Sequence, residues 1–250
     1  MIGDKENIIR PDSVNSTNDY ALELFKNKGI LTDGSVVVTD NQIAGKGLDR
    51  NRWESEPGKN LTFSVCLLPH FLPVEKQFEL NKALSLGICD FVREVVPNEK
   101  VSIKWPNDIY INNEKVAGIL ISSTIRGDLL DFTVAGFGIN INQTIFLSDA
   151  PNPVSLIKYT DKELNLDECL ELVCKKLDTR YGQLKANQFT LLDFNYLESL
   201  FRFNETHRFK FRGKMIKAKI TGVSNFGHLQ LVSSNGEKQE CDMKEISFII

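Results

Sequence analysis

The sequence has 250 residues, of which 42% are hydrophobic, enough for one sizeable core and a small second domain. Charged residues make up 25% of the chain and leave a net charge of −3, which argues against a protein that binds nucleic acid through a broad basic face. The five cysteines are scattered and form no C-x-x-C pair, so we expect a reduced, cytoplasmic protein. The N-terminus has no apolar signal sequence, no run of residues is long enough to span a membrane, and the three distant histidines predict no structural metal site.

The first 200 residues alternate short apolar runs, typical of strands, with segments of helical period. Strands are predicted at 8–11, 34–38, 60–68, 101–103, 109–111, 115–121 and 129–141, and helices at 20–25, 77–96, 166–184 and 190–200. From about Glu205 short alternating strands follow one another, with turns such as Asn235-Gly236 between them. These strands are predicted at 208–211, 215–223, 229–232, 239–243 and 246–250. We therefore expect a main domain over 1–204 and a small SH3-like β-barrel over 205–250.

A long loop between the second and third predicted strands, over 39–60, combines glycine with positive charge. It contains Gly45-Lys46-Gly47, then Arg50 and Arg52, and then Trp53. Glycines let the backbone approach a ligand and present N–H groups to an anion, and lysine or arginine neutralises phosphate or carboxylate. Tryptophan can stack on a flat ring. The pattern favours a loop that folds over a nucleotide or another small anion, and the alternative is an ordinary solvated loop.

Two further clusters combine polar and charged residues. Small polar residues fill 12–18 before the first helix, where a helix cap explains one of them and a polar pocket would explain the surplus. Lys104-Trp105-Pro106-Asn107-Asp108 begins a hairpin that turns at Asn112-Asn113 and returns through Lys115. The two lysines bracket either part of a binding site or a salt-bridged hairpin that faces water.

Glycines interrupt the strand predicted at 129–141. Gly136 and Gly138 alternate in the run Val134 to Asn140, and glycine within a strand marks a bulge or a close neighbour. That neighbour is either a ligand on the sheet or a tightly packed helix.

In the order and spacing of its motifs, the chain resembles a biotin protein ligase over nearly its whole length. The motifs are Ser16-Thr17-Asn18, Gly45-Lys46-Gly47…Trp53, Lys104 to Asp108 with Lys115 to Leu120, and Gly136 to Asn140. The resemblance implies an α+β fold: a mixed sheet with helices packed on it, like a class II synthetase, plus the C-terminal SH3-like domain. It also implies a two-step reaction, in which biotin and Mg-ATP give bound biotinyl-5′-AMP, and a lysine of a biotin carboxyl carrier protein then displaces AMP.

The resemblance also implies roles for individual residues. Lys115 and Lys46 would be catalytic, and magnesium would arrive with ATP rather than in a site of the apo protein. The expected biotin-binding residues are Ser16, Thr17, Asn18, Gln42, Gly45, Lys46, Gly47, Leu48, Lys115, Gly118, Gly136 and Gly138. The expected ATP-binding residues are Arg50, Arg52, Trp53, Lys104, Asn107, Asp108, Lys115 and Asn140.

The loop departs from the family pattern Gly-Arg-Gly-Arg-x-Gly-Arg. Leu48 and Asn51 replace basic residues and Arg50 takes a glycine position, so we expect Arg50 or Arg52 to grip the phosphates instead. About fifteen residues precede Ser16, too few for the DNA-binding domain of some members, so no DNA partner is expected. The family often pairs subunits, and the sequence leaves the oligomeric state and the acceptor open. The alternatives are a lipoate or octanoate protein ligase, and a non-catalytic binding module built on the C-terminal barrel.

Overall fold

The computed structural model describes residues 1–48, 51–148 and 150–249, and a seven-stranded mixed sheet forms its centre. The spatial order is β1-β2-β3-β7-β6-β5-β4, in which β1 and β2 are parallel and every other neighbouring pair is antiparallel. The strands are β1 (Ile8–Ile9), β2 (Ser35–Thr39), β3 (Leu61–Leu67), β4 (Val101–Lys104), β5 (Asp108–Ile111), β6 (Glu114–Arg126) and β7 (Leu129–Ile139).

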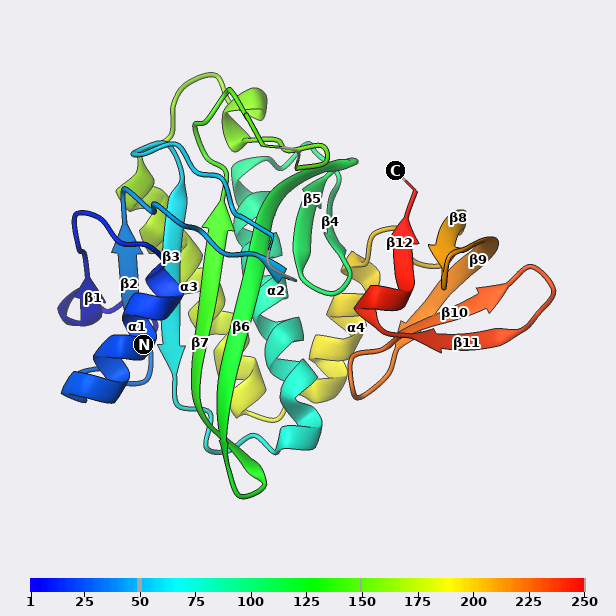
Figure 1. The fold of residues 1–250 in the computed structure, drawn as a ribbon, viewed down its shortest axis with the longest axis horizontal. Helices are drawn as coiled ribbons and strands as arrows, with labels where there is room; N and C mark the ends of the chain where they lie inside the picture. The colour runs from blue at the N-terminus through cyan, green and yellow to red at the C-terminus, as the bar shows by residue number, and fades with distance from the viewer. Residues whose placement is uncertain (49–50, 149, 250) are drawn as a thin grey trace.

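Helices cover both faces of this sheet. α1 (Thr17–Lys28) packs on one face, and α2 (Gln77–Val95) and α3 (Leu166–Lys185) pack on the other, with α4 (Phe189–Ser199) beside α2 (Figure 1). Because helices lie on both sides, every residue of β3 is buried, including the polar Thr62 and Ser64. Short 3₁₀ turns lie at Lys5–Asn7, Val74–Lys76, Leu156–Tyr159 and Met243–Glu245.

The C-terminal part forms a second, five-stranded antiparallel sheet in the order β11-β10-β9-β8-β12. Its strands are β8 (Thr206–Phe211), β9 (Lys214–Val223), β10 (Leu229–Ser233), β11 (Lys238–Cys241) and β12 (Ile246–Phe248). It lies beside the β4–β5 edge of the central sheet (Figure 1). The indole Nε1 of Trp105 donates a hydrogen bond to the carbonyl of Gly227 at 2.9 Å, which joins the two parts.

The α+β class, the mixed sheet and the small C-terminal β-domain are confirmed, and the differences are local. β6 runs to Arg126, five residues beyond the prediction, because exposed polar residues continue its hairpin with β7. The strand expected at 239–243 ends at Cys241, because Asp242 caps the 3₁₀ turn that follows. The boundary between 204 and 205 stays a prediction, although β8 begins at Thr206.

All five cysteine side chains are buried and free. Burial raises the pKa of the Cys66 and Cys89 thiols to about 12, so neither is a reactive thiolate at neutral pH. Within the described ranges, no helix combines the length and apolar character needed to cross a membrane.

Two helical glycines differ in the space around them, and they predict opposite effects of the same substitution. A methyl group at Gly87 of α2 would lie 2.8 Å from Leu177 Cδ2 and 3.0 Å from Leu177 Cα on α3, whereas nothing lies within 4 Å at Gly182. We expect Gly87→Ala to lower the free energy of unfolding by about 1–3 kcal/mol through overpacking. Gly182→Ala should raise it by about 0.5–1 kcal/mol, because alanine favours the helix.

Urea denaturation of both variants and of the unmodified chain measures this difference. Equal effects of the two substitutions would contradict the close α2–α3 packing.

Candidate active site

Two adjoining cavities, of about 380 Å³ and about 450 Å³, lie on the central sheet. Gly136 and Gly138 line the first, and by strand alternation they share a face with Phe132 and Val134, which pack under α1. The first cavity therefore lies on the α1 side of the sheet, next to the start of that helix. The two cavities share a wall made by Asn51, Arg52, Trp53, Lys104, Asp108 and Lys115.

The first cavity has a polar end near the N-terminus of α1. Ser16 caps the helix, since its hydroxyl accepts the N–H of Asp19 at 3.5 Å. The N–H of Thr17 donates to Gln42 Oε1 at 2.9 Å, and both residues line the cavity. Capping therefore accounts for Ser16, and of the other polar residues of 12–18 only Thr17 and Asn18 line the cavity.

A buried hydroxyl on β3 holds this polar end together. Ser64 Oγ lies 2.7 Å from Thr17 Oγ1 and 2.6 Å from Asn18 Oδ1, and the Asn18 amide also donates to the carbonyl of Leu120 at 3.1 Å. Gly136 makes room for this arrangement, because a Cβ there would lie 2.2 Å from Asn18 Oδ1. The neighbour that the glycine pattern predicted is, at Gly136, the side chain of Asn18.

Trp53 lies over the other glycines of the sheet. Gly118 and Gly138 are opposite each other on β6 and β7. A Cβ at Gly138 would lie 2.2 Å from Cε2 of the indole, and one at Gly118 would lie 3.1 Å from Cζ3. The indole Nε1 is buried, and no hydrogen-bond partner for it occurs among the described residues. In this structure the aromatic ring therefore rests on the glycine strip between the two cavities, with its N–H directed at the sheet.

An ion pair lies in the shared wall. Lys115 Nζ is 2.7 Å from Asp108 Oδ1, and 5.6 Å from the centre of the Trp53 ring. The side chains of Lys115 and Asp108 are 26% and 22% exposed, so both are partly shielded from water. The salt bridge that the hairpin alternative predicted does form, but both partners line the cavities.

Lys104 lies in the same wall between two aromatic rings. Its Nζ is 5.6 Å from the ring centre of Tyr110 and 5.1 Å from that of Phe248 on β12. Burial lowers the pKa of Lys104, nearby Asp108 partly offsets this, and the charge of Lys115 lowers it further. A second cation next to Lys115 makes this wall attractive to anions.

Two buried amides leave a carbonyl oxygen unpaired. Asn107 donates to the carbonyl of Ile119 at 2.8 Å, and Asn140 donates to the carbonyl of Val154 at 3.0 Å. The Oδ1 atoms of Asn107 and Asn140 have no partner among the described residues. Because a buried polar atom without a partner is costly, these oxygens suit a ligand that donates hydrogen bonds. Asn107 lines the first cavity and Asn140 the second.

The basic loop contributes less directly than the sequence suggested. Lys46 lines the first cavity, but its Nζ is 2.6 Å from Asp19 on α1. Gly45 lies outside both cavity linings, at the base of the loop, where a Cβ would be 2.5 Å from the carbonyl oxygen of Trp53. Arg50, expected to bind ATP, lies outside the described residues, and Arg52 lines both cavities.

Most residues named from the sequence thus come together. Those in the first cavity are Ser16, Thr17, Asn18, Gln42, Lys46, Gly47, Leu48, Arg52, Trp53, Lys104, Asn107, Asp108, Lys115, Gly118, Gly136 and Gly138. Those in the second are Arg52, Trp53, Lys104, Asp108, Lys115 and Asn140. Both groups include the residues of the shared wall.

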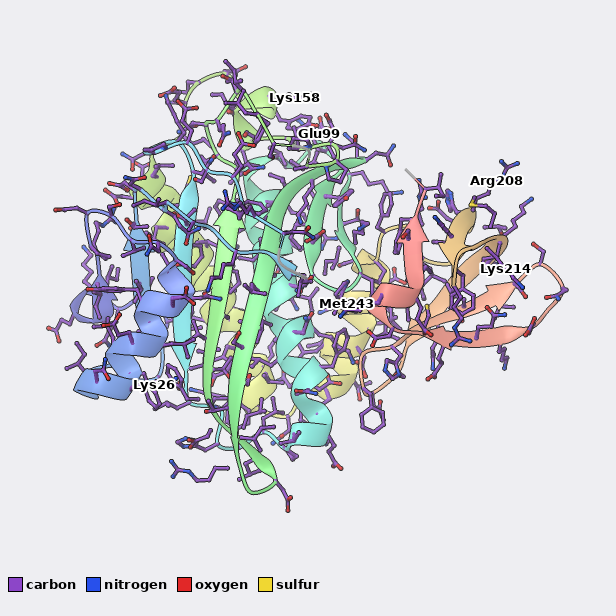
Figure 2. All side chains as sticks on the ribbon, viewed as in Figure 1. Lys26, Glu99, Lys158, Arg208, Lys214 and Met243 are labelled. Atoms are coloured by element: carbon purple, nitrogen blue, oxygen red, sulfur yellow. The ribbon has the colours of Figure 1, made fainter. Side chains whose placement is uncertain are left out.

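Several contributors were not identified from the sequence. Ser64 carried a weak signal, as a polar residue in a buried strand. The outer wall of the second cavity comes from an irregular segment that includes Phe146 and Pro153. The C-terminal sheet adds Met243 and Phe248 to the first cavity, and Figure 2 labels Met243 on the side of that sheet that faces the main domain. No local pattern in the sequence links these residues to the motifs.

This arrangement can hold an extended ligand with an anionic middle. Hydrogen-bonding groups lie at the far end of one cavity, unpaired amide oxygens lie in both, and cations lie between them. Positive groups at the junction would let two negatively charged molecules approach each other. Within the described ranges, no group of three His, Cys, Asp or Glu side chains is placed to hold a metal ion.

Comparisons with known proteins agree with this geometry. The model of the "Biotin/lipoate A/B protein ligase family" matches residues 11–140, just over half of the chain. The bifunctional ligase/repressor BirA of Bacillus spizizenii is 26% identical over 94% of this chain and 72% of its own length. A biotin–[acetyl-CoA-carboxylase] ligase of Paracoccus denitrificans is 27% identical over 76% and 79%.

A solved structure is also similar in fold and sequence. The biotin protein ligase from Aquifex aeolicus, in complex with biotin and ATP, has a TM-score of 0.78 and 26% identity over 97% of this chain and 98% of that one. The extent of the family match, together with this similarity in fold, shows that the chain belongs to the biotin/lipoate A/B protein ligase family.

Proposed function

We propose that the chain is an ATP-dependent biotin protein ligase, which activates biotin as biotinyl-5′-AMP and transfers it to a lysine of a biotin carboxyl carrier protein. The observation that carries this proposal is the pair of cavities that meet at Lys115. A ligand with a polar ring at one end and a carboxylate at the other matches the first cavity, and a nucleotide matches the second. The similar Aquifex aeolicus protein was solved with both biotin and ATP.

The polar end of the first cavity suits the ureido ring of biotin. That ring offers two N–H donors and one carbonyl acceptor. Ser16, Thr17, Asn18 and Gln42 supply hydroxyl and amide groups of both kinds. The carboxylate would then extend toward Lys115, and Trp53 would leave the glycine strip to make room and stack beside the adenine.

The first step joins two anions. An oxygen of the biotin carboxylate attacks the α-phosphorus of ATP, and the bond to the pyrophosphate oxygen breaks. Negative charge builds up on the phosphoryl oxygens, where Lys115, Lys104 and Arg52 would stabilise it. The protein needs no nucleophile of its own, because the substrate carboxylate fills that role.

The second step uses the mixed anhydride. The amine of the acceptor lysine attacks the acyl carbon, the bond to the phosphate oxygen breaks, and the amine loses a proton as AMP leaves. Water would destroy the anhydride, so a loop closed over the site protects it. Magnesium bound to ATP, the carrier-protein partner, the cytoplasmic location and a homodimer belong to this proposal as predictions.

Incubation of the chain with biotin, Mg-ATP and a carrier domain tests the function directly. We expect release of pyrophosphate and a mass gain of one biotinyl group on the carrier. The family model also covers lipoate ligases, so lipoate is the competing acid. Modification by lipoate in place of biotin would overturn the assignment.

Lys115→Gln should slow adenylate formation by about a hundredfold or more, because it removes a cation from the reacting groups. Lys158→Gln is the matched control: Lys158 is also paired with a carboxylate, Glu114, at 2.6 Å, but lines neither cavity. Pyrophosphate release measures both, and circular dichroism checks that both fold. A rate for Lys115→Gln close to that of the control would refute the role of Lys115.

Ser64→Ala should weaken biotin binding by about tenfold, because Asn18 and Thr17 lose the hydroxyl that orients them. Binding of ATP should change little. Ser85→Ala is the control, since Ser85 is equally buried but, among the described residues, its hydroxyl bonds only Asn81, within α2. Titration calorimetry with biotin separates the two, and similar affinities would show that Ser64 does not shape the polar end.

A further inference from the structure

The outer wall of the second cavity has little apolar burial to hold it. It belongs to two irregular stretches that follow β7, 144–148 and 150–153. Ile145 is 67% exposed and Leu147 is 87% exposed, while Phe146 is half-buried beside the cavity. Because its aliphatic side chains lie in water, the stretch 144–148 depends on polar contacts for its position.

Two side chains supply those contacts. The N–H groups of Leu147 and Ser148 donate to Glu54 Oε1 at 2.7 Å and to Oε2 at 2.8 Å, one to each oxygen. Gln143 Nε2 donates to the carbonyl of Ile145 at 2.7 Å. Across the described ranges of the chain, these are the hydrogen bonds that the backbone of 144–148 makes.

The same two side chains connect this wall to the basic loop. Glu54 directly follows Trp53, so the carboxylate that holds the wall is adjacent to the ring between the cavities. Gln143 Oε1 accepts the N–H of Glu56 at 3.0 Å and the amide of Asn60 at 2.5 Å. The base of the loop and the start of the wall therefore form one polar network around the buried side chains of Asn60 and Gln143.

The stretch 150–153 is attached to Lys115. The N–H of Lys115 donates to the carbonyl of Asn152 at 2.7 Å, and the N–H of Val154 donates to the carbonyl of Lys115 at 2.9 Å. The stretch 144–148 is thus held by the carboxylate of Glu54, and the stretch 150–153 by the backbone of the lysine at the cavity junction.

The negative charge of Glu54 is unexpected at its position. It lines a cavity that otherwise suits an anion, where a free carboxylate would repel phosphate. Burial would raise the pKa of Glu54, but hydrogen bonds from Ser148 and from the N–H groups of Leu147 and Ser148 outweigh it, so the net pKa lies below the ordinary value. The carboxylate is therefore ionised at neutral pH, and both oxygens are already engaged by the wall.

We propose that Glu54 is a positioning residue for the nucleotide, which holds the 144–148 wall over the second cavity and so sets the affinity for ATP without contacting the reacting atoms. This inference rests on the proposed function, which assigns the nucleotide to that cavity. Biotin, in the first cavity, should bind independently of this contact.

Glu54→Gln tests the inference, because it keeps the shape but replaces one acceptor with an amide that cannot accept an N–H. We expect KM for ATP in pyrophosphate release to rise about tenfold or more, with kcat changed less than about threefold and biotin affinity unchanged. Glu56→Gln is the control. Glu56 lies two residues after Glu54 and carries the same charge, but its side chain is exposed and lines neither cavity. Hydrogen exchange of the free protein should show faster exchange at Leu147 and Ser148 in Glu54→Gln alone.

Unchanged exchange at those two amides, or an unchanged KM for ATP, would overturn the inference. Equal losses of biotin and ATP affinity would also overturn it, since they would indicate a general disturbance of the fold. Because the exchange measurement needs no turnover, its outcome is separate from the proposed function, which fails if the unmodified chain releases no pyrophosphate.

Discussion

The ion pair between Lys115 and Asp108 is the interaction on which the site depends. An isolated ammonium in a partly shielded wall would be costly, and Asp108 compensates for it in the absence of substrate. The β5–β6 hairpin sets this geometry, because β5 carries Asp108 and β6 carries Lys115. An incoming carboxylate or phosphate then meets a cation that is already oriented, and shares it with Asp108 rather than ordering a free side chain. The antiparallel register of β5 and β6 therefore determines the site by placing its charged groups next to each other.

Glycine gives this sheet a surface on which ligands can lie. At Gly136 the missing side chain admits the amide of Asn18, and at Gly138 it admits a flat ring. The structure has Trp53 on that strip, with an indole N–H that no described residue accepts. The same surface that accepts an indole can accept the flat parts of a substrate, so the resting position of Trp53 and substrate binding are alternatives for one space.

The sequence predicted the parts of the site that depend on local chemistry. Lys104, Asp108 and Lys115 are close because two hairpin turns reverse the chain between them. Turn-forming residues, such as Asn112-Asn113, predict these reversals from the sequence. Alternating glycines likewise predicted a close neighbour on β7. The sequence could not show that this neighbour is Asn18 at one position and Trp53 at the next. Nor could it show that Glu54 holds Leu147, because that contact joins segments separated by about ninety residues and depends on how two irregular stretches cross. Ser64 carried only a weak signal, because the sequence does not show that this polar residue is buried or that Thr17 and Asn18 lie next to it.

The C-terminal sheet belongs to the site rather than standing beside it. Phe248 on β12 covers Lys104 from one side while Tyr110 on β5 covers it from another, and burial between them lowers the pKa of the lysine. A lysine that has lost part of its hydration gains more from an approaching anion than one in open water does, because the intervening medium screens the attraction less. The hydrogen bond from Trp105 to Gly227 attaches the turn after β4 to the turn between β9 and β10. If Lys104 binds phosphate as proposed, the small domain would strengthen that interaction by excluding water, although the residues that it contributes to the described cavity lining, Met243, Ile246, Ser247 and Phe248, carry no charge.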